Sequence, residues 1–243
     1  MIFLRTHGGL GNQLFQVFYA AYASNKGEHD IIVFHDNRYK HKFNLSKCFN
    51  RLPINIKPID DNLIHKYRLI KILEKIKVNN GFFKLNKTIY LDGYFQSDNN
   101  YHSIEKIEYA KSFLKKIFDK TDNKINAELV HIRLGDFFLD KNKKILKIKD
   151  MLNTVNQNIT SHIMTNEEEL FLSDEIKTIL HEKNAIIKST SNLEDWEVLI
   201  EMSKYKSIIS NGSTLALWAS IIGDAKLTTF DHSFDNFISK LNL

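Results

Sequence analysis

The chain has 243 residues, 43% of them hydrophobic and 26% charged, with a formal net charge of +5 and a pI near 9.0. This length supports one large α/β domain or two smaller ones, each with a buried core. The single cysteine, Cys48, excludes an internal disulfide and a zinc site made of four cysteines, and a reducing compartment suits such a chain best.

No basic segment followed by a long apolar one opens the chain, and its longest apolar run, 215–222, is far shorter than the roughly 20 residues that span a bilayer. We therefore expect a cytoplasmic protein. The basic charge either favours an anionic partner or reflects only a lysine-rich composition, because the lysines are spread along the chain. The most basic stretch, Lys66–Lys87, has the pattern of an amphipathic helix and loop, whose lysines form either a solvated face or a peripheral membrane contact.

The first half of the chain alternates between strand and helix patterns. Met1–Thr6 is apolar enough for a buried strand, and after a glycine turn apolar residues recur at helical spacing up to Gly27. Asp30–His35 and Thr88–Asp92 have the composition of further strands, and a helix is predicted at about 104–118. These elements predict one parallel sheet with helices packed on it.

A polar linker, Asp119–Asn126, precedes a second alternating array. That array is predicted to contain strands at Leu129–Arg133, Leu170–Leu172, Ala185–Lys188 and Ser207–Ile209, a polar helix after the first strand, and helices at Glu175–Glu182, Leu193–Tyr205 and Thr214–Ile222. We therefore expect an α/β fold of two doubly wound lobes, 1–120 and 121–243, facing a central cleft, with the last helix able to pack back on the first lobe. A single continuous sheet is the alternative.

The stretch HGGLGNQLFQ lies between the first strand and its helix. Its glycines allow a sharp turn and close approach to a ligand, and the amides of a helix start attract anions. It is neither a dinucleotide fingerprint nor a P-loop, because Leu14 stands where the third glycine would and no Lys-Ser/Thr pair follows. The stretch is either a plain turn or part of a ligand site in which Asn12 and Gln13 bind sugar hydroxyls.

The stretch LVHIRLGDFF puts His131 and Arg133 on one side of a strand, with Asp136 in the loop at its carboxyl end, where open α/β sheets bind ligands. Arg133 either grips a phosphate or forms an ion pair with Asp136 that holds the loop. In LFLSDE, Asp174 follows another predicted strand, as a helix N-cap or as a hydrogen-bond acceptor for a base or ribose. In ISNGSTLALWAS a helix starts at 213 or 214, which is either ordinary capping or a second anion site.

In this order, the motifs HGGLGNQLFQ, GYFQSDNNY, HIRLGD, LFLSDE and ISNGSTLALWAS resemble those of the bacterial α-1,2-fucosyltransferases of glycosyltransferase family 11, across residues 8–220. The resemblance implies a GT-B-like architecture of two Rossmann-type lobes, GDP-β-L-fucose as the donor, inversion at the anomeric carbon, and no metal or other cofactor. It implies transfer to O-2 of galactose in an oligosaccharide or lipid-linked acceptor, during synthesis of O-antigen or capsule.

The resemblance also assigns site residues. It implies that His131 and Asp174 face the guanosine and that Arg133 binds the β-phosphate. It implies a pyrophosphate pocket completed by Ser213 and Thr214, and a cleft lined from the other lobe by Gly9, Gly11, Asn12 and Gln13.

Some positions depart from the pattern of the family. Leu134 stands where the family usually has a second arginine, and Asp98 and Asn99 stand where an acidic residue and a lysine are commoner. The last motif, SNGSTLALWAS, also differs from the family's usual SNSTFSWWGAW. These departures affect the predicted acceptor and linkage more than the class of donor.

Chemistry of this kind needs positive charge near the departing GDP, which Arg133 and the helix start at 213–214 would supply. Inversion also needs a base near the acceptor hydroxyl, and the candidates are Asp136, His7 and Asp98. Asp136 is equally suited to orient Arg133.

Two other functions compete with this prediction. One is transfer of another sugar from a GDP-sugar on the same scaffold. The other is a non-catalytic module that binds nucleotides or nucleic acid, which the basic charge favours. The charge is diffuse and no aromatic-plus-basic strand motif of RNA-binding proteins is present, so we expect no nucleic-acid partner.

Overall fold

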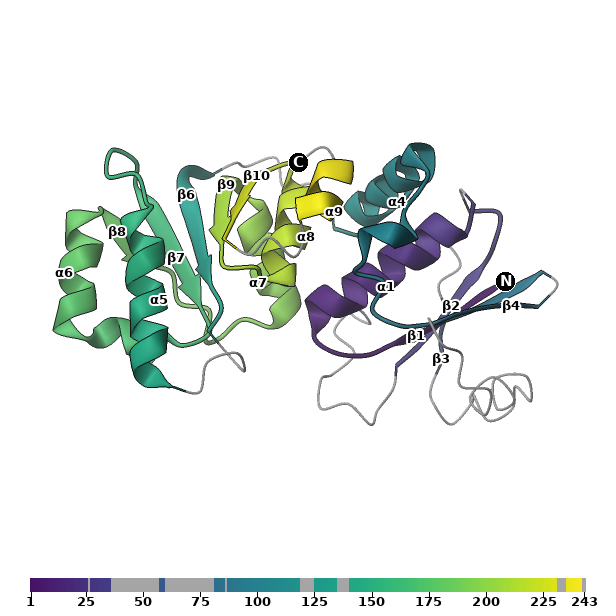
Figure 1. The fold of residues 1–243 in the computed structure, drawn as a ribbon, viewed down its shortest axis with the longest axis horizontal. Helices are drawn as coiled ribbons and strands as arrows, with labels where there is room; N and C mark the ends of the chain where they lie inside the picture. Colours follow the sequence, from purple (N-terminus) through teal and green to yellow (C-terminus); the bar gives the residue numbers. More distant parts are fainter. Residues whose placement is uncertain are drawn as a thin grey trace. The chain divides into compact units, whose positions relative to one another are not determined.

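The computed structural model of the chain describes residues 1–25, 27–35, 57–59, 81–85, 87–118, 125–134, 140–230 and 235–241. The chain divides into two compact units (Figure 1). The first unit comprises Met1–Lys120 and Asn236–Asn242, and the second comprises Thr121–Asp235 with Leu243. Within the described residues, each unit is built on a sheet of five strands.

The sheet of the first unit has the strand order β3-β2-β1-β5-β4. Its strands are β1 (Ile2–Thr6), β2 (Ile31–His35), β3 (Lys57–Ile59), β4 (Phe82–Leu85) and β5 (Thr88–Asp92). The predicted strands at 1–6, 30–35 and 88–92 are confirmed, and they pair in parallel. The sequence analysis did not predict β4, which adds an antiparallel edge to this sheet by forming a hairpin with β5, since only two residues join them.

Two helices of the first unit pack against each other, α1 (Leu10–Ala23) and α4 (Ile104–Ile117), and both lie near the predicted bounds. A short 3-10 helix, η3 (Asp98–Asn100), precedes α4. The last helix, α9 (Asp235–Lys240), also joins this unit. Its Phe237 is buried, with ring centroids 5.1 Å from both Phe15 and Tyr101. The end of the chain therefore completes the aromatic core of the first unit.

The sheet of the second unit has the order β10-β9-β6-β7-β8, and all of its described pairings are parallel. Its strands are β6 (Ile125–Ile132), β7 (Ser161–Thr165), β8 (Ala185–Ile187), β9 (Tyr205–Ser210) and β10 (Lys226–Thr229). Its helices are α5 (Lys141–Asn153), α6 (Asp174–Glu182), α7 (Asp195–Ser203) and α8 (Thr214–Gly223).

Helices cover both faces of this second sheet (Figure 1). Side chains of α5 and α6 join Val130, Ile132 and Ile163 in one buried apolar cluster. Helices α7 and α8 pack against each other and against β9 on the other face. This arrangement of a parallel sheet between two layers of helices is the doubly wound architecture that the alternating pattern predicts.

One predicted strand is wrong. Residues 170–172 belong to a 3-10 helix, η4 (Glu168–Leu172), and the strand beside β6 is β7, which the sequence pattern missed. Phe171 is buried in the apolar cluster, whereas Leu172 is 63% exposed. The strand was predicted from a run of three apolar residues, which is too short to distinguish a strand from a helix. Tyr205, predicted at the end of a helix, is instead the first residue of β9.

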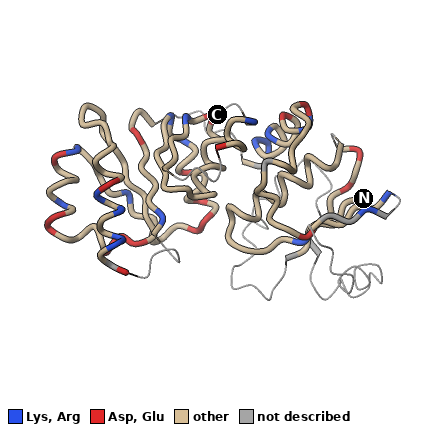
Figure 2. Tube along the Cα trace, viewed as in Figure 1, with Lys and Arg blue, Asp and Glu red and all other residues tan. Residues whose placement is uncertain are grey.

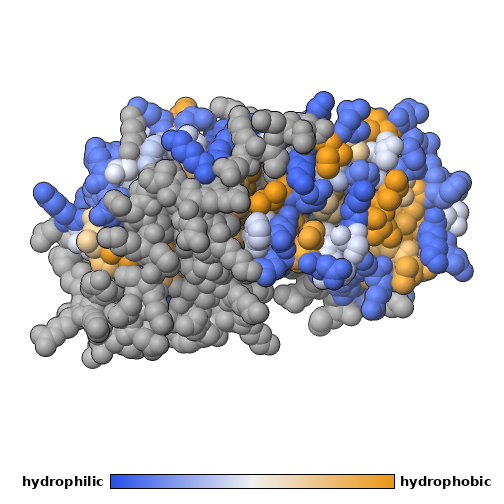
Figure 3. All heavy atoms as spheres, turned by 180° about the vertical axis from the view of Figure 1, so that it is seen from behind, coloured by the Kyte–Doolittle hydropathy of each residue, from blue (hydrophilic) through white to orange (hydrophobic). Residues whose placement is uncertain are grey.

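Among the described residues, charged side chains of both signs are interleaved along each unit (Figure 2). Residues 66–80 and 86 of the predicted amphipathic segment 66–87 lie outside the described residues, and 82–85, predicted as part of a helix and loop, form strand β4. Hydrophobic and hydrophilic residues also alternate on the face of the second unit seen in Figure 3. Of the helices described, none has both the length and the apolar character needed to cross a membrane.

Gly223 permits the close approach of α8 and α7. A Cβ atom at this position would lie 2.1 Å from the backbone oxygen of Ser203, and both residues are buried. Backbone cannot move aside as a flexible side chain does, so we expect Gly223→Ala to lower the free energy of unfolding of the second unit by about 3 kcal/mol.

Tryptophan fluorescence during urea unfolding measures this effect selectively, because both tryptophans, Trp196 and Trp218, lie in the second unit. The control is Lys177→Ala on the exposed surface of α6, which should change stability by less than about 0.5 kcal/mol. Equal stabilities of the two variants would contradict the packing argument.

Candidate functional site

The carboxyl edge of the second sheet brings together two motifs that lie about 80 residues apart. Strands β6 and β9 pair in parallel, with His131 opposite Ser210. Just beyond the strand ends, the amide of Asn211 forms two hydrogen bonds with the backbone of Arg133. Its Oδ1 accepts from the Arg133 N–H at 3.0 Å, and its Nδ2 donates to the Arg133 carbonyl at 2.6 Å. Asn211 therefore fixes the position from which the side chain of Arg133 starts.

Arg133 is half-buried, and its guanidinium forms no hydrogen bond or ion pair with any residue that the structure describes. The predicted partner Asp136 lies outside the described residues, so the proposed ion pair between them stays a prediction. Leu134, at the position of the family's second arginine, is fully buried in the apolar cluster. A leucine here stabilises the core of the unit, and a charged side chain at this position would have to leave it.

His131 is 7% exposed and lies in β6 between two residues of the α5–α6 cluster. Because side chains alternate along a strand, His131 lies on the face covered by α7 and α8. Burial, together with the positive charge of Arg133, lowers the pKa of His131 to about 4. Its Nδ1 is buried and has no hydrogen-bond partner among the residues that the structure describes. At neutral pH this residue is therefore an uncharged imidazole with an unused polar atom.

Helix α8 begins at the same edge of the sheet. Ser213 is its N-cap residue, but the buried Ser213 hydroxyl makes no capping hydrogen bond and has no partner within the described part of the chain. Thr214 is the first helical residue, and no acidic side chain lies in the first turn. Free amides at a helix start carry partial positive charge, so this end of α8 has the features of an anion-binding position.

Asp174 is placed differently from the prediction. The strand that should have carried it to the sheet edge does not form, and Asp174 is the first residue of α6, after the N-cap Ser173. Its side chain is fully exposed, and it lies 4.0 Å from the ammonium of Lys177. Its predicted contact with a guanosine stays a prediction.

The glycine loop of the first unit is held by its own side chains. Gly8 has a φ of +78°, a conformation that glycine adopts readily, and the Nε2 of Gln13 donates to the Gly8 carbonyl at 2.8 Å. Gln13 is fully buried, so the structure gives it a role in supporting the loop that the sequence did not predict. By contrast, a Cβ at Gly9 would meet no atom within 4 Å. Gly9 therefore leaves open space at the start of α1.

Asn12 and Gly11 lie in the first turn of α1. Gly11 is buried, while Asn12 is partly exposed and its Oδ1 accepts a hydrogen bond of 2.8 Å from Gln96. Gln96 belongs to the GYFQS motif, so this bond joins two motifs of the first unit. Asp98 follows in η3, and its side chain lies outside what the structure describes.

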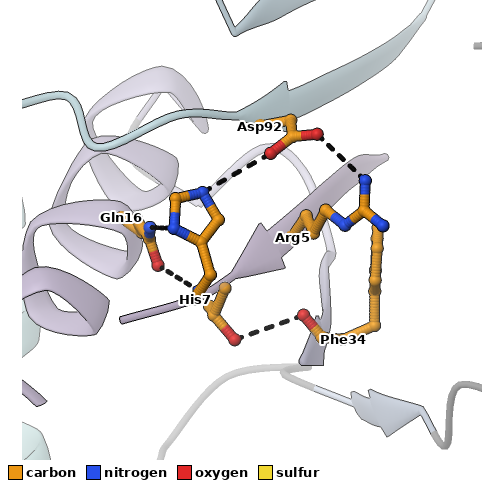
Figure 4. Close-up of polar contacts among 6 residues, drawn as sticks. Arg5, His7, Gln16, Phe34 and Asp92 are labelled. Carbon is orange, nitrogen blue, oxygen red and sulfur yellow. Dashed lines mark hydrogen bonds and ion pairs between the residues drawn. The ribbon is translucent and has the colours of Figure 1, made fainter. Parts of the chain in front are cut away.

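A carboxylate that the sequence analysis did not select lies at the carboxyl edge of the first sheet. Asp92, the last residue of β5, is the register partner of Arg5 in β1. One oxygen of Asp92 lies 3.2 Å from the Arg5 guanidinium and the other lies 3.6 Å from Nε2 of His7 (Figure 4). Burial of Asp92 opposes its ionisation, but the hydrogen bond from His7 and the charge of Arg5 outweigh burial and lower its pKa.

His7 is buried, and Gln16 of α1 holds it from the other side. The Oε1 of Gln16 accepts from the His7 backbone N–H at 3.1 Å, and its Nε2 lies 3.3 Å from Nδ1 of the ring (Figure 4). The sequence signal for this network was a pair of opposite charges at the ends of two apolar strands, Arg5 and Asp92. The ion pair between Arg5 and Asp92 can be predicted only once β1 and β5 are known to be neighbours.

Metal binding has no support from the described residues, among which no group of three or more His, Cys, Asp or Glu side chains could hold an ion. The predicted independence from metal stays an expectation.

No protein-family model matches the chain, and neither does any curated protein. Among solved structures, the chain is similar to the fucosyltransferase NodZ from Bradyrhizobium, with a TM-score of 0.54 and 9% sequence identity over 95% of each chain. NodZ α-1,6-fucosyltransferase co-crystallised with GDP matches with a TM-score of 0.54 and 9% identity, over 95% of this chain and 94% of that one. The same enzyme soaked with GDP-fucose matches with a TM-score of 0.50 and 8% identity over 91% of each chain.

At these identities the similarity establishes the fold. The chain has an α/β, GT-B-like fold of two Rossmann-type units, as its sequence predicts. The antiparallel edge strand β4 is the exception to the parallel order.

The low pKa of His131 makes stability depend on pH. The unfolded chain protonates this histidine near pH 6.5, whereas the folded protein does so only near pH 4, so the unfolded state binds more protons between these values. The stabilisation is fully present above pH 6.5 and is lost as the pH falls toward 4. Between pH 7 and pH 5 the wild-type second unit should lose about 2 kcal/mol more than His131→Gln.

Urea unfolding at several pH values, followed by tryptophan fluorescence, measures this difference. Parallel stability curves for the wild type and His131→Gln would show that His131 is not held neutral by the fold.

Proposed function

We propose that this protein is an inverting glycosyltransferase that moves L-fucose from GDP-β-L-fucose to a hydroxyl of a saccharide. The observation that carries the proposal is the carboxyl edge of the second sheet. There a half-buried arginine, a neutral histidine and a helix start come together, and Nδ1 of His131 and the hydroxyl of Ser213 have no partner among the described residues. Buried polar atoms without partners are uncommon and suggest a ligand that satisfies them.

A GDP-sugar matches the chemistry of this edge. The guanidinium of Arg133 provides a planar fork for a phosphate, and the amides and hydroxyls of Ser213 and Thr214 provide further donors. His131 and Asp174 are proposed to face the guanosine. NodZ has been crystallised with GDP and with GDP-fucose, and the shared fold favours the same class of donor here.

The proposed reaction uses these groups to stabilise the leaving group. As the bond between the sugar and the β-phosphate breaks, GDP gains negative charge and the sugar becomes oxocarbenium-like. The backbone of Arg133 and the start of α8 are fixed by the fold, which limits the reorganisation needed to stabilise this charge at the moment of reaction. Metal-independent transfer is part of the proposal.

The acceptor is proposed to be an oligosaccharide or lipid-linked saccharide that receives fucose at O-2 of galactose, in the synthesis of O-antigen or capsule. This assignment rests on the resemblance to glycosyltransferase family 11. The proposed place of the enzyme in the cytoplasm, in peripheral contact with the membrane, rests on the single cysteine and on the basic stretch Lys66–Lys87. Gly9, Gly11 and Asn12 are proposed to contribute to the donor site from the glycine loop.

We expect Arg133→Ala to abolish transfer and to weaken GDP binding by a factor of about 10 to 100, because a charged hydrogen bond to a buried partner is worth about 1.5–3 kcal/mol. Calorimetry with GDP and an assay of GDP release measure the two effects. Lys226→Ala is the control, since it removes a positive charge from an exposed position at the amino end of β10 in the same unit. Normal turnover of GDP-fucose by Arg133→Ala would refute the proposed role.

Ser213→Ala separates a binding role from a structural one. The hydroxyl makes no hydrogen bond within the described protein, so its removal should leave the stability of the second unit unchanged or slightly raised. The same variant should bind GDP about tenfold more weakly if the hydroxyl contacts the pyrophosphate. A loss of stability with unchanged GDP affinity would instead make Ser213 an ordinary structural residue.

Transfer from another GDP-sugar is the second candidate function, because the groups at this edge recognise the diphosphate and do not discriminate between sugars. A screen with GDP-fucose and GDP-mannose against a panel of β-galactosides separates the two by GDP release, and NMR of the product gives the linkage. Tight GDP binding without any transfer would favour a non-catalytic nucleotide-binding module.

A further inference from the structure

Asp92 is a carboxylate at the carboxyl edge of the first sheet, where β5 ends. The Arg5 guanidinium lies 3.2 Å from one of its oxygens, and Nε2 of His7 lies 3.6 Å from the other. Both neighbours favour the ionised form of Asp92. Its side chain is nevertheless 33% exposed, whereas those of Arg5 and His7 are 13% and 7% exposed. Arg5 and His7 therefore fix the position of the carboxylate, and part of the carboxylate stays accessible to a ligand.

His7 supports Asp92 and is poorly placed to act as a base itself. Nε2 faces Asp92 and Nδ1 faces the amide nitrogen of Gln16, so both ring nitrogens are engaged by the protein (Figure 4). A single neutral tautomer satisfies both contacts, with Nε2–H donating to Asp92 and Nδ1 accepting from Gln16. His7 is thus a positioning residue, and the group that it positions is the carboxylate.

An aromatic ring lies beside this network. Tyr94 is 43% exposed, and its ring stands edge-on to that of His7 at a centroid distance of 4.5 Å. A partly exposed ring offers an apolar face on which the C–H face of a pyranose can pack. The side-chain amides of Asn12 and Gln96 are hydrogen-bonded to each other. Asn12 follows His7 in the sequence, and Gln96 follows Tyr94. A carboxylate, an open aromatic ring and side-chain amides are groups suited to binding a sugar.

We propose that Asp92 is the catalytic carboxylate that accepts the proton of the attacking saccharide hydroxyl, while the ring of Tyr94 supports that sugar. The inference rests on the proposed function and names a base that is not among the three sequence candidates. Of those candidates, His7 acts through Asp92, and the side chains of Asp98 and Asp136 lie outside the described residues.

The step balances as a single displacement. The hydroxyl oxygen forms a bond to the anomeric carbon of the donor, and its O–H bond breaks with the proton moving to a carboxylate oxygen of Asp92. The bond from the anomeric carbon to the β-phosphate oxygen breaks, and its electron pair leaves with GDP. The hydroxyl becomes strongly acidic as it bonds to the electron-poor carbon, so an ionised carboxylate is a sufficient base.

The first test compares Asp92→Asn with the wild type by steady-state kinetics and by calorimetry with GDP. We expect kcat to fall at least about 100-fold, the usual contribution of a general base, while the Kd for GDP stays within twofold. Asp30→Asn is the matched control, because Asp30 precedes β2 at the opposite edge of the same sheet. Circular dichroism and thermal melting confirm that both variants are folded.

The second test uses the exposed ring, whose removal should spare the fold. Tyr94→Ala should raise KM for the saccharide about tenfold with little change in kcat, and Tyr94→Phe, which keeps the ring, should restore it. An unchanged KM in Tyr94→Ala would overturn the proposed packing of the sugar on the Tyr94 ring. This test remains valid even if Asp92→Asn fails to fold.

The outcomes separate this inference from the proposed function. A wild-type protein that transfers fucose, together with a folded Asp92→Asn variant of equal kcat, overturns the inference alone. A wild-type protein that neither binds GDP nor transfers a sugar overturns the proposed function, and the inference with it.

Discussion

Parallel pairing of strands that are distant in the sequence is the constraint on which both candidate sites depend. In a parallel sheet the carboxyl ends of neighbouring strands meet at one edge, so the polar residues that follow them are gathered there. The pairing of β6 with β9 brings Asn211 to the backbone of Arg133, and the pairing of β1 with β5 brings Asp92 to Arg5. Without these pairings neither set of residues would form a site.

The carboxyl edges of the two sheets differ in their charged groups. In the second unit a positive side chain, an uncharged imidazole and a helix start leave positive potential unsatisfied, which suits an anionic ligand. In the first unit a carboxylate is balanced by Arg5 and by the histidine that Gln16 orients. The edge of β6 and β9 in the second unit thus suits a diphosphate, and the edge of β1 and β5 in the first unit suits a proton or a hydroxyl.

Packing at the end of the chain adds a further dependence. Phe237 of α9 contacts aromatic residues of α1 and Tyr101, and the ammonium of Lys240 donates to the Tyr101 carbonyl at 3.2 Å. Residues that follow the whole second unit in the sequence are therefore part of the core of the first. Helix α1, which follows the glycine loop, packs on this core through Phe15 and Phe18.

The sequence by itself determined the elements with strong local signals, such as the apolar strands at 2–6 and 88–92 and the periodic helices after the glycine loop and at 104–117. It also marked His131, Arg133 and Ser213 as chemically unusual. It misassigned 170–172, because three apolar residues read alike in a strand and in a 3-10 helix that buries only Phe171. Tertiary structure alone decided which strand ends are neighbours. It thereby made Gln13 a buried support, His7 a positioning residue and Asp92 the exposed carboxylate, since burial and partner distance are set by residues up to 87 positions away.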